Sequence, residues 1–425
     1  MILANITTPL LGLVDTAVLG HLPTVHALAG ASIGALLITQ MYWICGFLRM
    51  SVTGLSAQTF GQAQAEGNDT SEYFKPLIQG LTLALLLSLI LFAFQQPILW
   101  LGTYFAEASA ETAVSLNSYF QVRIFGAPAA LINLVVIGWL VGQQRTKAVM
   151  LIQIGGNVLN VALNLLFVLV FEWQVSGVAA ATVISEYAMM FCGLWLSINA
   201  SVIEKITRRW FELSEVNRMF SLNTSMFIRN LVLQLCLAFI TFQGAQLGAQ
   251  TAAANAILMQ FFVLISLGLD GVAYAVEALV GEAKGRKDKT LIWLNTRRGL
   301  IWSSIFALAY TLFFILFGAQ LLSLLTNKAD LIAYAQTFLE LMFVLPLIAH
   351  WCFLFDGVFI GLSRGKAMRD TMLLSGLLVF FPVWLWFESH GNWGLWLAFL
   401  AFLGARGITL GWVFYRDLQT GRVLH

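Results

Sequence analysis

Charged residues are scarce in this chain of 425 residues: only 10% are Asp, Glu, Lys or Arg, whereas 59% are hydrophobic. Soluble globular proteins carry roughly 25% charged residues, because their surface faces water. The mean hydropathy of +0.83 fits a protein whose surface faces lipid. A net charge of only +2 gives no field that would attract nucleic acid. The composition therefore excludes a soluble protein and indicates a membrane protein.

Motifs for nucleotide binding and catalysis are also absent. No G-x-x-x-x-G-K-[ST] stretch occurs, so no phosphate-binding loop is predicted. The five histidines are scattered, and the four cysteines lie in apolar runs without metal-ligand spacing (Cys45, Cys192, Cys236 and Cys352). We therefore predict no disulfide, no metal site, no cofactor and no enzymatic activity. An existing ion gradient is the energy source that remains, with H+ or else Na+ as the coupling ion.

Long apolar segments dominate the chain. A membrane helix needs about 20 such residues, and these segments are too long for membrane strands. We predict an all-α polytopic membrane protein. Its first span begins at Met1 without a basic lead-in or cleavage site, so we expect one or two turns to precede it and no signal peptide. The twelve predicted spans are 1–20, 27–60, 76–101, 112–142, 148–171, 177–199, 217–243, 251–281, 291–325, 332–361, 369–387 and 393–415.

Lysines and arginines concentrate in alternate loops, whereas the opposite loops hold Lys328 alone. Positive loops face the cytoplasm, so we predict a bacterial inner (cytoplasmic) membrane protein with both termini cytoplasmic. The cations on that side are Lys75, Arg145, Lys147, Lys205, Arg208, Arg209, Arg218, Lys284, Arg286, Lys287, Lys289, Arg297, Arg298, Arg364, Lys366, Arg369, Arg416 and Arg422.

Two stretches of the first half recur in the second half in the same order. Six spans per half give both halves the same orientation, which predicts two six-helix lobes related by a pseudo-two-fold along the membrane normal. We expect an N-lobe at residues 1–200, a cytoplasmic linker at 201–216 and a C-lobe at 217–425. The matches are Gly138-Trp-Leu-Val-Gly-Gln-Gln-Arg-Thr-Lys147 with Gly357-Val-Phe-Ile-Gly-Leu-Ser-Arg-Gly-Lys366, and Gly61-Gln-Ala63 with Gly281-Glu-Ala283.

One acid stands out in the first half. A charge at mid-bilayer costs at least roughly 2.5–3.5 kcal/mol, so its presence needs a reason. Asp15 lies inside the first span, after Pro9, which removes a backbone hydrogen bond and permits a kink. Desolvation favours the protonated form of a carboxylate, so proton binding and release can be coupled to the shape of this helix.

Neutral polar side chains in other spans are candidate neighbours of this carboxylate. Asn160 and Asn164 are four residues apart and share one face of the fifth span. Thr182 in the sixth span and Tyr119 in the fourth add hydroxyl groups. Such groups can orient a carboxylate, a proton-carrying water or a dehydrated sodium ion. Ordinary hydrogen bonds between helices are the alternative.

The second half has its own charges inside spans. Asp270 and Glu277 are seven residues apart on one face of the eighth span, and Asp356 lies in the tenth. Arg229 in the seventh span is a candidate partner for one of them. These residues form either a second ion or cation-substrate site or a static network. The remaining charges inside spans are expected to form ion pairs between helices: Arg49, Arg123, Glu186 and Arg406.

These residues also carry a family resemblance that extends over the whole chain. The chain resembles the MATE (multidrug and toxic compound extrusion) transporters, and their DinF branch in particular. The matching stretches are Val14-Asp15-Thr16, Phe47-Leu48-Arg49-Met50, Asp270-Gly-Val-Ala-Tyr-Ala-Val-Glu277 and Asp356-Gly357 with Arg364-Gly365.

The resemblance implies a V-shaped cavity between two lobes and export of amphipathic, often cationic, compounds against inward proton or sodium flow. It implies that Asp15 is the main protonation site of the N-lobe, near Tyr119, Asn160, Asn164 and Thr182, and that protonation bends the first helix near Pro9. Asp356 matches a carboxylate that helps form a sodium site in other branches. Asn164 stands where some members have a second aspartate, which puts two-carboxylate coupling in doubt.

Proton-driven multidrug efflux is the function that we favour, with sodium-driven efflux as a variant. A flippase for lipid-linked precursors would need a basic cavity, and the embedded arginines are scattered. A membrane scaffold would not need acids inside its spans. As partners we expect small amphipathic substrates and membrane lipid, with the protein a monomer.

Overall fold

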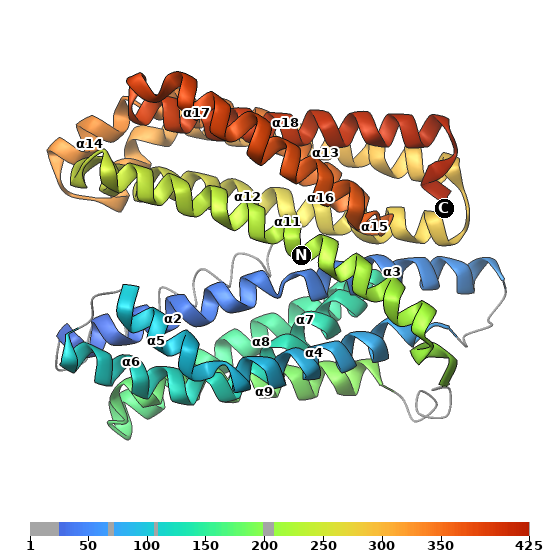
Figure 1. The fold of residues 1–425 in the computed structure, drawn as a ribbon, viewed down its shortest axis with the longest axis horizontal. Coiled ribbons are helices and arrows are strands. Elements are labelled where there is room, and N and C mark those ends of the chain that lie inside the picture. Colours follow the sequence, from blue (N-terminus) through green and yellow to red (C-terminus); the bar gives the residue numbers. More distant parts are fainter. Residues whose placement is uncertain (1–24, 67–71, 106–108, 199–207, 425) are drawn as a thin grey trace. The chain divides into compact units, whose positions relative to one another are not determined.

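The computed structural model describes residues 25–66, 72–105, 109–198 and 208–424, and this part of the chain consists of helices without any strand (Figure 1). It contains 11 helical segments long and apolar enough to cross a membrane. They correspond in order to the second to twelfth predicted spans. The first predicted span lies outside the described residues, and so do Pro9 and Asp15. The predicted all-α polytopic class is confirmed.

The chain divides into two compact units. Of the described residues, the first unit takes those up to Ser56 and those from 72 to Asn217. The second takes the end of α3 (Phe47–Ala65) and everything from Arg218 onward. In the second unit, Gln58 near the end of α3 donates hydrogen bonds to the Gly361 carbonyl and the Ser363 hydroxyl, both at 2.8 Å.

The first unit is a bundle in which α2 packs along α6, α8 along α9, and α7 against both α4 and α9. One of its buried apolar clusters joins Ile38, Leu116 and Phe120 between α2 and α6. Its helices are α2 (Val25–Ile44), α3 (Phe47–Ala65), α4 (Lys75–Ala93), α5 (Gln95–Phe105), α6 (Ala110–Arg123), α7 (Ala127–Gly142), α8 (Thr146–Leu165) and α9 (Gln174–Ser197).

The second unit is a longer bundle with one large apolar core. There α12 packs along α13 and α15, and α15 packs along α18. Phe261, Phe314, Met342 and Phe399 are among the fully buried residues of this core. Its helices are α11 (Leu213–Gln246), α12 (Ala249–Gly285), α13 (Lys289–Leu325), α14 (Ala329–Gln336), α15 (Leu339–Gly361), α16 (Gly365–Leu374), α17 (Phe381–Phe387) and α18 (Asn392–Gln419).

Four predicted spans are interrupted in the structure. In the predicted span 27–60, a turn at Cys45 and Gly46 separates α2 from α3. The predicted span 76–101 breaks at Phe94, because Pro97 at the start of α5 has no N–H to donate to the preceding turn. A 3-10 turn separates α6 from α7 just before Pro128. The predicted span 332–361 was too long, because α14 ends at Gln336 and the membrane-length helix α15 starts only at Leu339.

The repeated sequence motif folds into the same turn in both units. After α7, Gln144 has a φ of 58°, and after α15, Ser363 has a φ of 50°. The backbone hydrogen bonds agree as well: Arg145 N donates to Leu140 O at 2.8 Å, and Arg364 N donates to Phe359 O at 3.0 Å. A shared left-handed turn at matching positions supports a duplication, because non-glycine residues rarely adopt this conformation.

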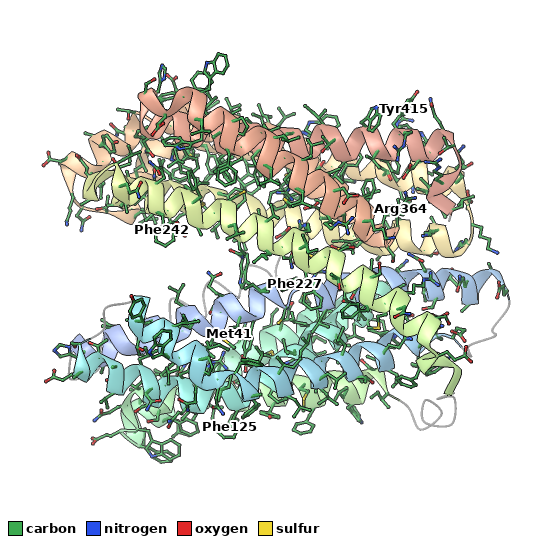
Figure 2. All side chains as sticks on the ribbon, in the orientation of Figure 1. Met41, Phe125, Phe227, Phe242, Arg364 and Tyr415 are labelled. Carbon is green, nitrogen blue, oxygen red and sulfur yellow. The ribbon has the colours of Figure 1, made fainter. Side chains whose placement is uncertain are left out.

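Large apolar side chains point outward from both units. Phe125 and Tyr415 lie on the outside of their helices, with 60% and 58% of their surface exposed (Figure 2). Soluble monomers rarely expose extensive apolar patches. Many long apolar side chains share this outward position, including Leu89, Leu312 and Trp386. Their number fits helices surrounded by lipid.

Candidate functional site

The polar residues predicted for the N-lobe lie together in the interior of the first unit. Asn160 and Asn164 on α8 are 1% and 0% exposed. Asn164 Nδ2 donates to Asn160 Oδ1 at 2.8 Å, and Asn160 Nδ2 donates to Thr182 Oγ1 on α9 at 3.1 Å. The Thr182 hydroxyl in turn donates to the Val178 carbonyl at 3.1 Å. A directed chain of hydrogen bonds therefore crosses from α8 to α9.

Tyr119 on α6 reaches the same stretch of α9 by packing. Its ring is buried, and Gly34 on α2 leaves the space it occupies, because a Cβ there would collide with the ring. The apolar cluster around Tyr119 consists of Ala27, Ala31, Val168, Val175, Val178 and Ala179. Thr182 and the apolar residues clustered with Tyr119 thus lie on one stretch of α9, which Asn160 reaches by its hydrogen bond to Thr182.

A buried ion pair lies elsewhere in the first unit. Arg123 at the end of α6 donates from both Nη atoms to both carboxylate oxygens of Glu186 on α9, at 2.8 and 3.0 Å. Asn133 on α7 donates to the Glu186 carbonyl at 2.8 Å, and the guanidinium lies 5.7 Å from the centre of the Tyr42 ring. Two-point pairing balances one positive charge with one negative charge, as the sequence predicted for these residues.

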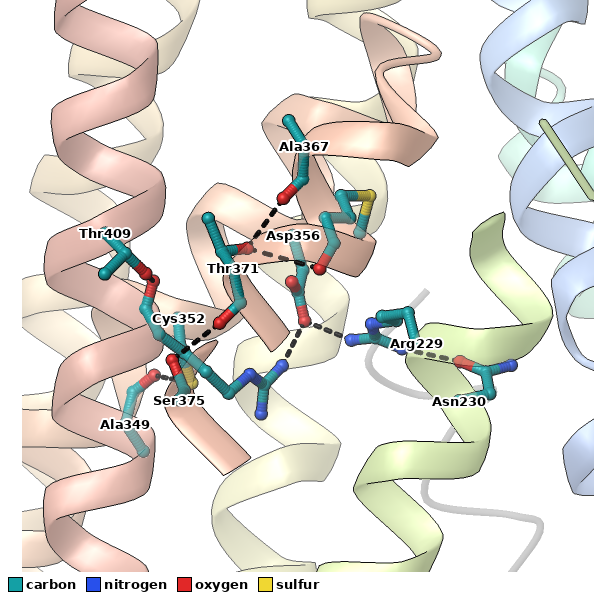
Figure 3. A network of polar contacts seen from close by, with 11 residues as sticks. Arg229, Asn230, Ala349, Cys352, Asp356, Ala367, Thr371, Ser375 and Thr409 are labelled. Carbon is teal, nitrogen blue, oxygen red and sulfur yellow. Dashed lines mark hydrogen bonds and ion pairs between the residues drawn. The ribbon is translucent and has the colours of Figure 1, made fainter. Parts of the chain in front are cut away.

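The second unit brings two arginines to one carboxylate (Figure 3). Arg406 Nη2 on α18 donates to Asp356 Oδ2 on α15 at 2.6 Å, and Arg229 Nη2 on α11 donates to the same oxygen. Arg229 also donates to the Asn230 side chain at 2.8 Å. The side chains of Arg229, Asp356 and Arg406 are only 7%, 13% and 5% exposed. We call these three residues the arginine cluster.

The arginine cluster answers part of what the sequence left open. Arg229 does pair with an acid of a neighbouring span, and that acid is Asp356. Glu277 is buried on α12 and Asp270 is half-buried on the same helix, which packs along α15. Asp356 Oδ2 is occupied by two guanidinium groups, which compete directly with any cation for this oxygen. The sodium role that the family resemblance implied for Asp356 stays a prediction.

Some polar residues of these networks were not singled out from the sequence. Asn133 donates a hydrogen bond to the Glu186 carbonyl, and Asn230 accepts one from Arg229. Asn255 on α12 accepts a hydrogen bond from the Trp396 ring and donates to Asn392 on α18, both at 2.8 Å. Asparagine inside a long apolar run was the signal that could have found them. Among the described residues, no group of three or more His, Cys, Asp or Glu side chains could hold a metal ion.

Hydrogen-bond chains and ion pairs are buried between long apolar helices. This combination is typical of a polytopic helical membrane protein of the transporter type. The MatE family model matches residues 1–166 and 225–385, one stretch in each half of the chain. The chain belongs to the MATE family, whose members are transporters and not enzymes.

Individual relatives agree with this assignment. The chain is 35% identical to DNA damage-inducible protein F of Escherichia coli (strain K12), over 99% of this chain and 91% of that protein. It is 23% identical to multidrug resistance protein NorM of Vibrio cholerae, over 97% of this chain and 92% of that protein. The resemblance to the DinF branch that the sequence suggested is therefore confirmed.

Solved structures share the fold. A crystal structure of a MATE in the bent conformation matches with a TM-score of 0.86, covering 99% of this chain and 94% of that chain at 19% identity. A MATE in the straight conformation matches with a TM-score of 0.84, covering 99% and 95%, also at 19% identity. At this identity the match establishes the arrangement of the helices and nothing about substrate.

Proposed function

We propose that this chain is a secondary antiporter that exports amphipathic and cationic organic compounds and is driven by protons. Membership in the MATE family supports transport, and the name of the NorM relative, a multidrug resistance protein, supports efflux of diverse compounds. The strong bias of lysine and arginine supports a bacterial inner membrane location with cytoplasmic termini. The expected substrates are small molecules, and the protein is expected to work as a monomer in contact with membrane lipid.

Transport by this protein is proposed to use two lobes, at residues 1–200 and 217–425, joined by a cytoplasmic linker at 201–216. The boundary between the two compact units, which falls after Asn217, supports this scheme. Solved MATE structures described as bent and straight support the idea that members of this fold adopt more than one conformation.

Asp15 is the proposed coupling residue, with Pro9 as the hinge of the first helix. The observation that carries this proposal is the buried hydrogen-bond chain from Asn164 through Asn160 to Thr182. Buried polar groups persist where they are satisfied or where they serve a function, because leaving water costs free energy. In the proposed mechanism, this chain and the Tyr119 hydroxyl orient the Asp15 carboxyl group. Protonation of Asp15 then removes its charge and lets the first helix bend.

Reconstitution in liposomes tests this scheme directly. A fluorescent organic cation is offered under a proton gradient alone and under a sodium gradient alone. We expect transport under the proton gradient, and we expect Asp15→Asn to abolish it because the amide cannot release a proton. The matched control is Glu111→Gln, since the Glu111 side chain is 74% exposed and pairs only with the half-exposed His26 within the described residues.

Two outcomes would contradict the proton scheme. Proton-driven transport by Asp15→Asn at the wild-type rate would remove Asp15 from the mechanism. Transport that follows the sodium gradient at constant pH and ignores the proton gradient would establish sodium coupling in its place.

A further inference from the structure

The two units differ in how they balance buried arginines. In the first unit, the guanidinium of Arg123 faces the carboxylate of Glu186. Both Nη atoms donate, and both carboxylate oxygens accept. In the second unit, the guanidinium groups of Arg229 and Arg406 share a single oxygen of Asp356. The first pair is neutral, whereas the arginine cluster carries one positive charge in excess.

An excess positive charge in this position is costly. An arginine stays protonated even when buried, so the cluster cannot shed the charge by losing a proton. The side chains of Arg229 and Arg406 are more than nine-tenths buried, and that of Asp356 is 13% exposed. Burying an ion without a counterion is unfavourable in a medium of low dielectric constant. The charge therefore requires a partner.

The surroundings of Arg406 offer little compensation. Its described neighbours include Asp356 and the thiols of Cys352 and Cys236, and thiols are neutral at physiological pH. Within the described part of the chain, the Nε atoms of Arg229 and Arg406 are both buried and have no acceptor. The Nε of Arg123 also has none, so the charge imbalance is the feature that sets the cluster apart.

We propose that the arginine cluster is an anion site, which binds one monovalent anion on Arg229 and Arg406 in competition with Asp356. The anion is either chloride or the carboxylate or phosphate group of a transported compound. Asp356 then acts as a tethered internal anion that holds the two guanidinium groups until a free anion displaces it. Only the second source of the anion rests on the proposed transport function, since chloride binding can be measured without transport.

Thermal unfolding of the purified full-length protein in detergent tests the binding. Sodium chloride replaces sodium methanesulfonate at constant ionic strength and pH. We expect a saturable rise of Tm with chloride, because a ligand that binds only the folded state stabilises it. Arg406→Gln and Arg229→Gln each leave one arginine for one carboxylate, so each should weaken the apparent chloride affinity by at least about tenfold.

Two further variants keep the test sharp. Asp356→Asn removes the competing carboxylate and should strengthen chloride binding, even if this variant is less stable without chloride. Arg123→Gln is the matched control: it removes a buried arginine of equal burial, but from a pair that is already neutral. It should lower Tm while leaving the chloride dependence intact.

The source of the anion is distinguished by competition. Octanoate and methyl phosphate are added at fixed chloride and then tested in counterflow with liposomes. Competition together with counterflow would assign the site to an anionic group of the substrate. Chloride binding without such competition would assign it to the inorganic ion. A Tm that does not depend on chloride, or a dependence lost equally in Arg123→Gln, would overturn the anion site.

Discussion

Arg145 and Arg364 occupy the same position in the two halves of the chain and make the same kind of contact. Each precedes a helix, α8 or α16, with a backbone φ of −84° or −95°. Arg145 Nη1 donates to the Leu196 carbonyl at 2.7 Å, and Arg364 Nη1 donates to the Arg422 carbonyl at 2.9 Å. Each arginine thus ties a turn to a carbonyl at or beyond the end of its unit's last helix. Within the described residues, only Arg364 of the two also pairs with an acid, Asp417, at 2.8 Å.

This difference predicts unequal effects of removing the two arginines. Arg364→Ala should lower the free energy of unfolding by about 2 kcal/mol, because the buried Asp417 keeps only the more exposed Arg416 as its partner. Arg145→Ala should cost less than about 1 kcal/mol, since it loses one exposed hydrogen bond. Thermal unfolding in detergent measures both. Equal losses would show that Asp417 does not depend on Arg364.

The neutral pair of Arg123 and Glu186 should respond differently to single and double substitution. Glu186→Ala alone should cost about 3–5 kcal/mol, because it leaves a buried guanidinium without a counterion. The double variant Arg123→Met with Glu186→Leu should recover most of this loss, since apolar residues of similar size can replace a buried pair. Gly126→Ala should also destabilise the pair, because its Cβ would meet atoms of both side chains. Unfolding curves of the three variants measure their free energies of unfolding. If the double variant is no more stable than Glu186→Ala, the apolar pair does not replace the ion pair.

Thr182 links the hydrogen-bond chain to α9, and its hydroxyl is the group that matters. Thr182→Val keeps the shape but leaves the buried Asn160 amide without its acceptor, which should cost about 1–3 kcal/mol and reduce transport. Thr182→Ser restores the hydroxyl and should retain most of the activity. Transport rates divided by the amount of folded protein separate the loss of transport from the loss of stability. If the valine variant transports like the serine variant, the chain does not serve the coupling site.

Lys287 follows α12 with a φ of 56°, a conformation that disfavours side chains with a Cβ. Lys287→Gly should therefore raise the free energy of unfolding by about 1 kcal/mol, because glycine adopts this conformation freely. Lys287→Val should lower it, since a β-branched side chain is least tolerated there. Lys287 is exposed, so transport should be unchanged in the glycine variant. A fall in Tm for glycine would refute this account.

The sequence predicted most of the membrane architecture because hydrophobicity is a local property. Each long apolar run must become a helix in lipid, since its backbone groups have no other hydrogen-bond partners there. The matching glycine-rich stretches also predicted the repeat that Gln144 and Ser363 now display in their backbone conformation. The interruptions were harder to predict, although Pro97 and Pro128 mark two of them.

The partners of the buried charges were beyond the sequence. It predicted that arginines inside spans would pair with acids, but Arg123 and Glu186 are 63 residues apart, and Arg229 and Asp356 are 127 apart. Which acid an arginine meets depends on which helix faces pack together and at what height, and the bundle as a whole sets both. The tertiary structure alone therefore decided that one unit holds a balanced pair and the other two arginines on one carboxylate. The sequence determined only that such charges had to be buried between helices, because lipid cannot solvate them.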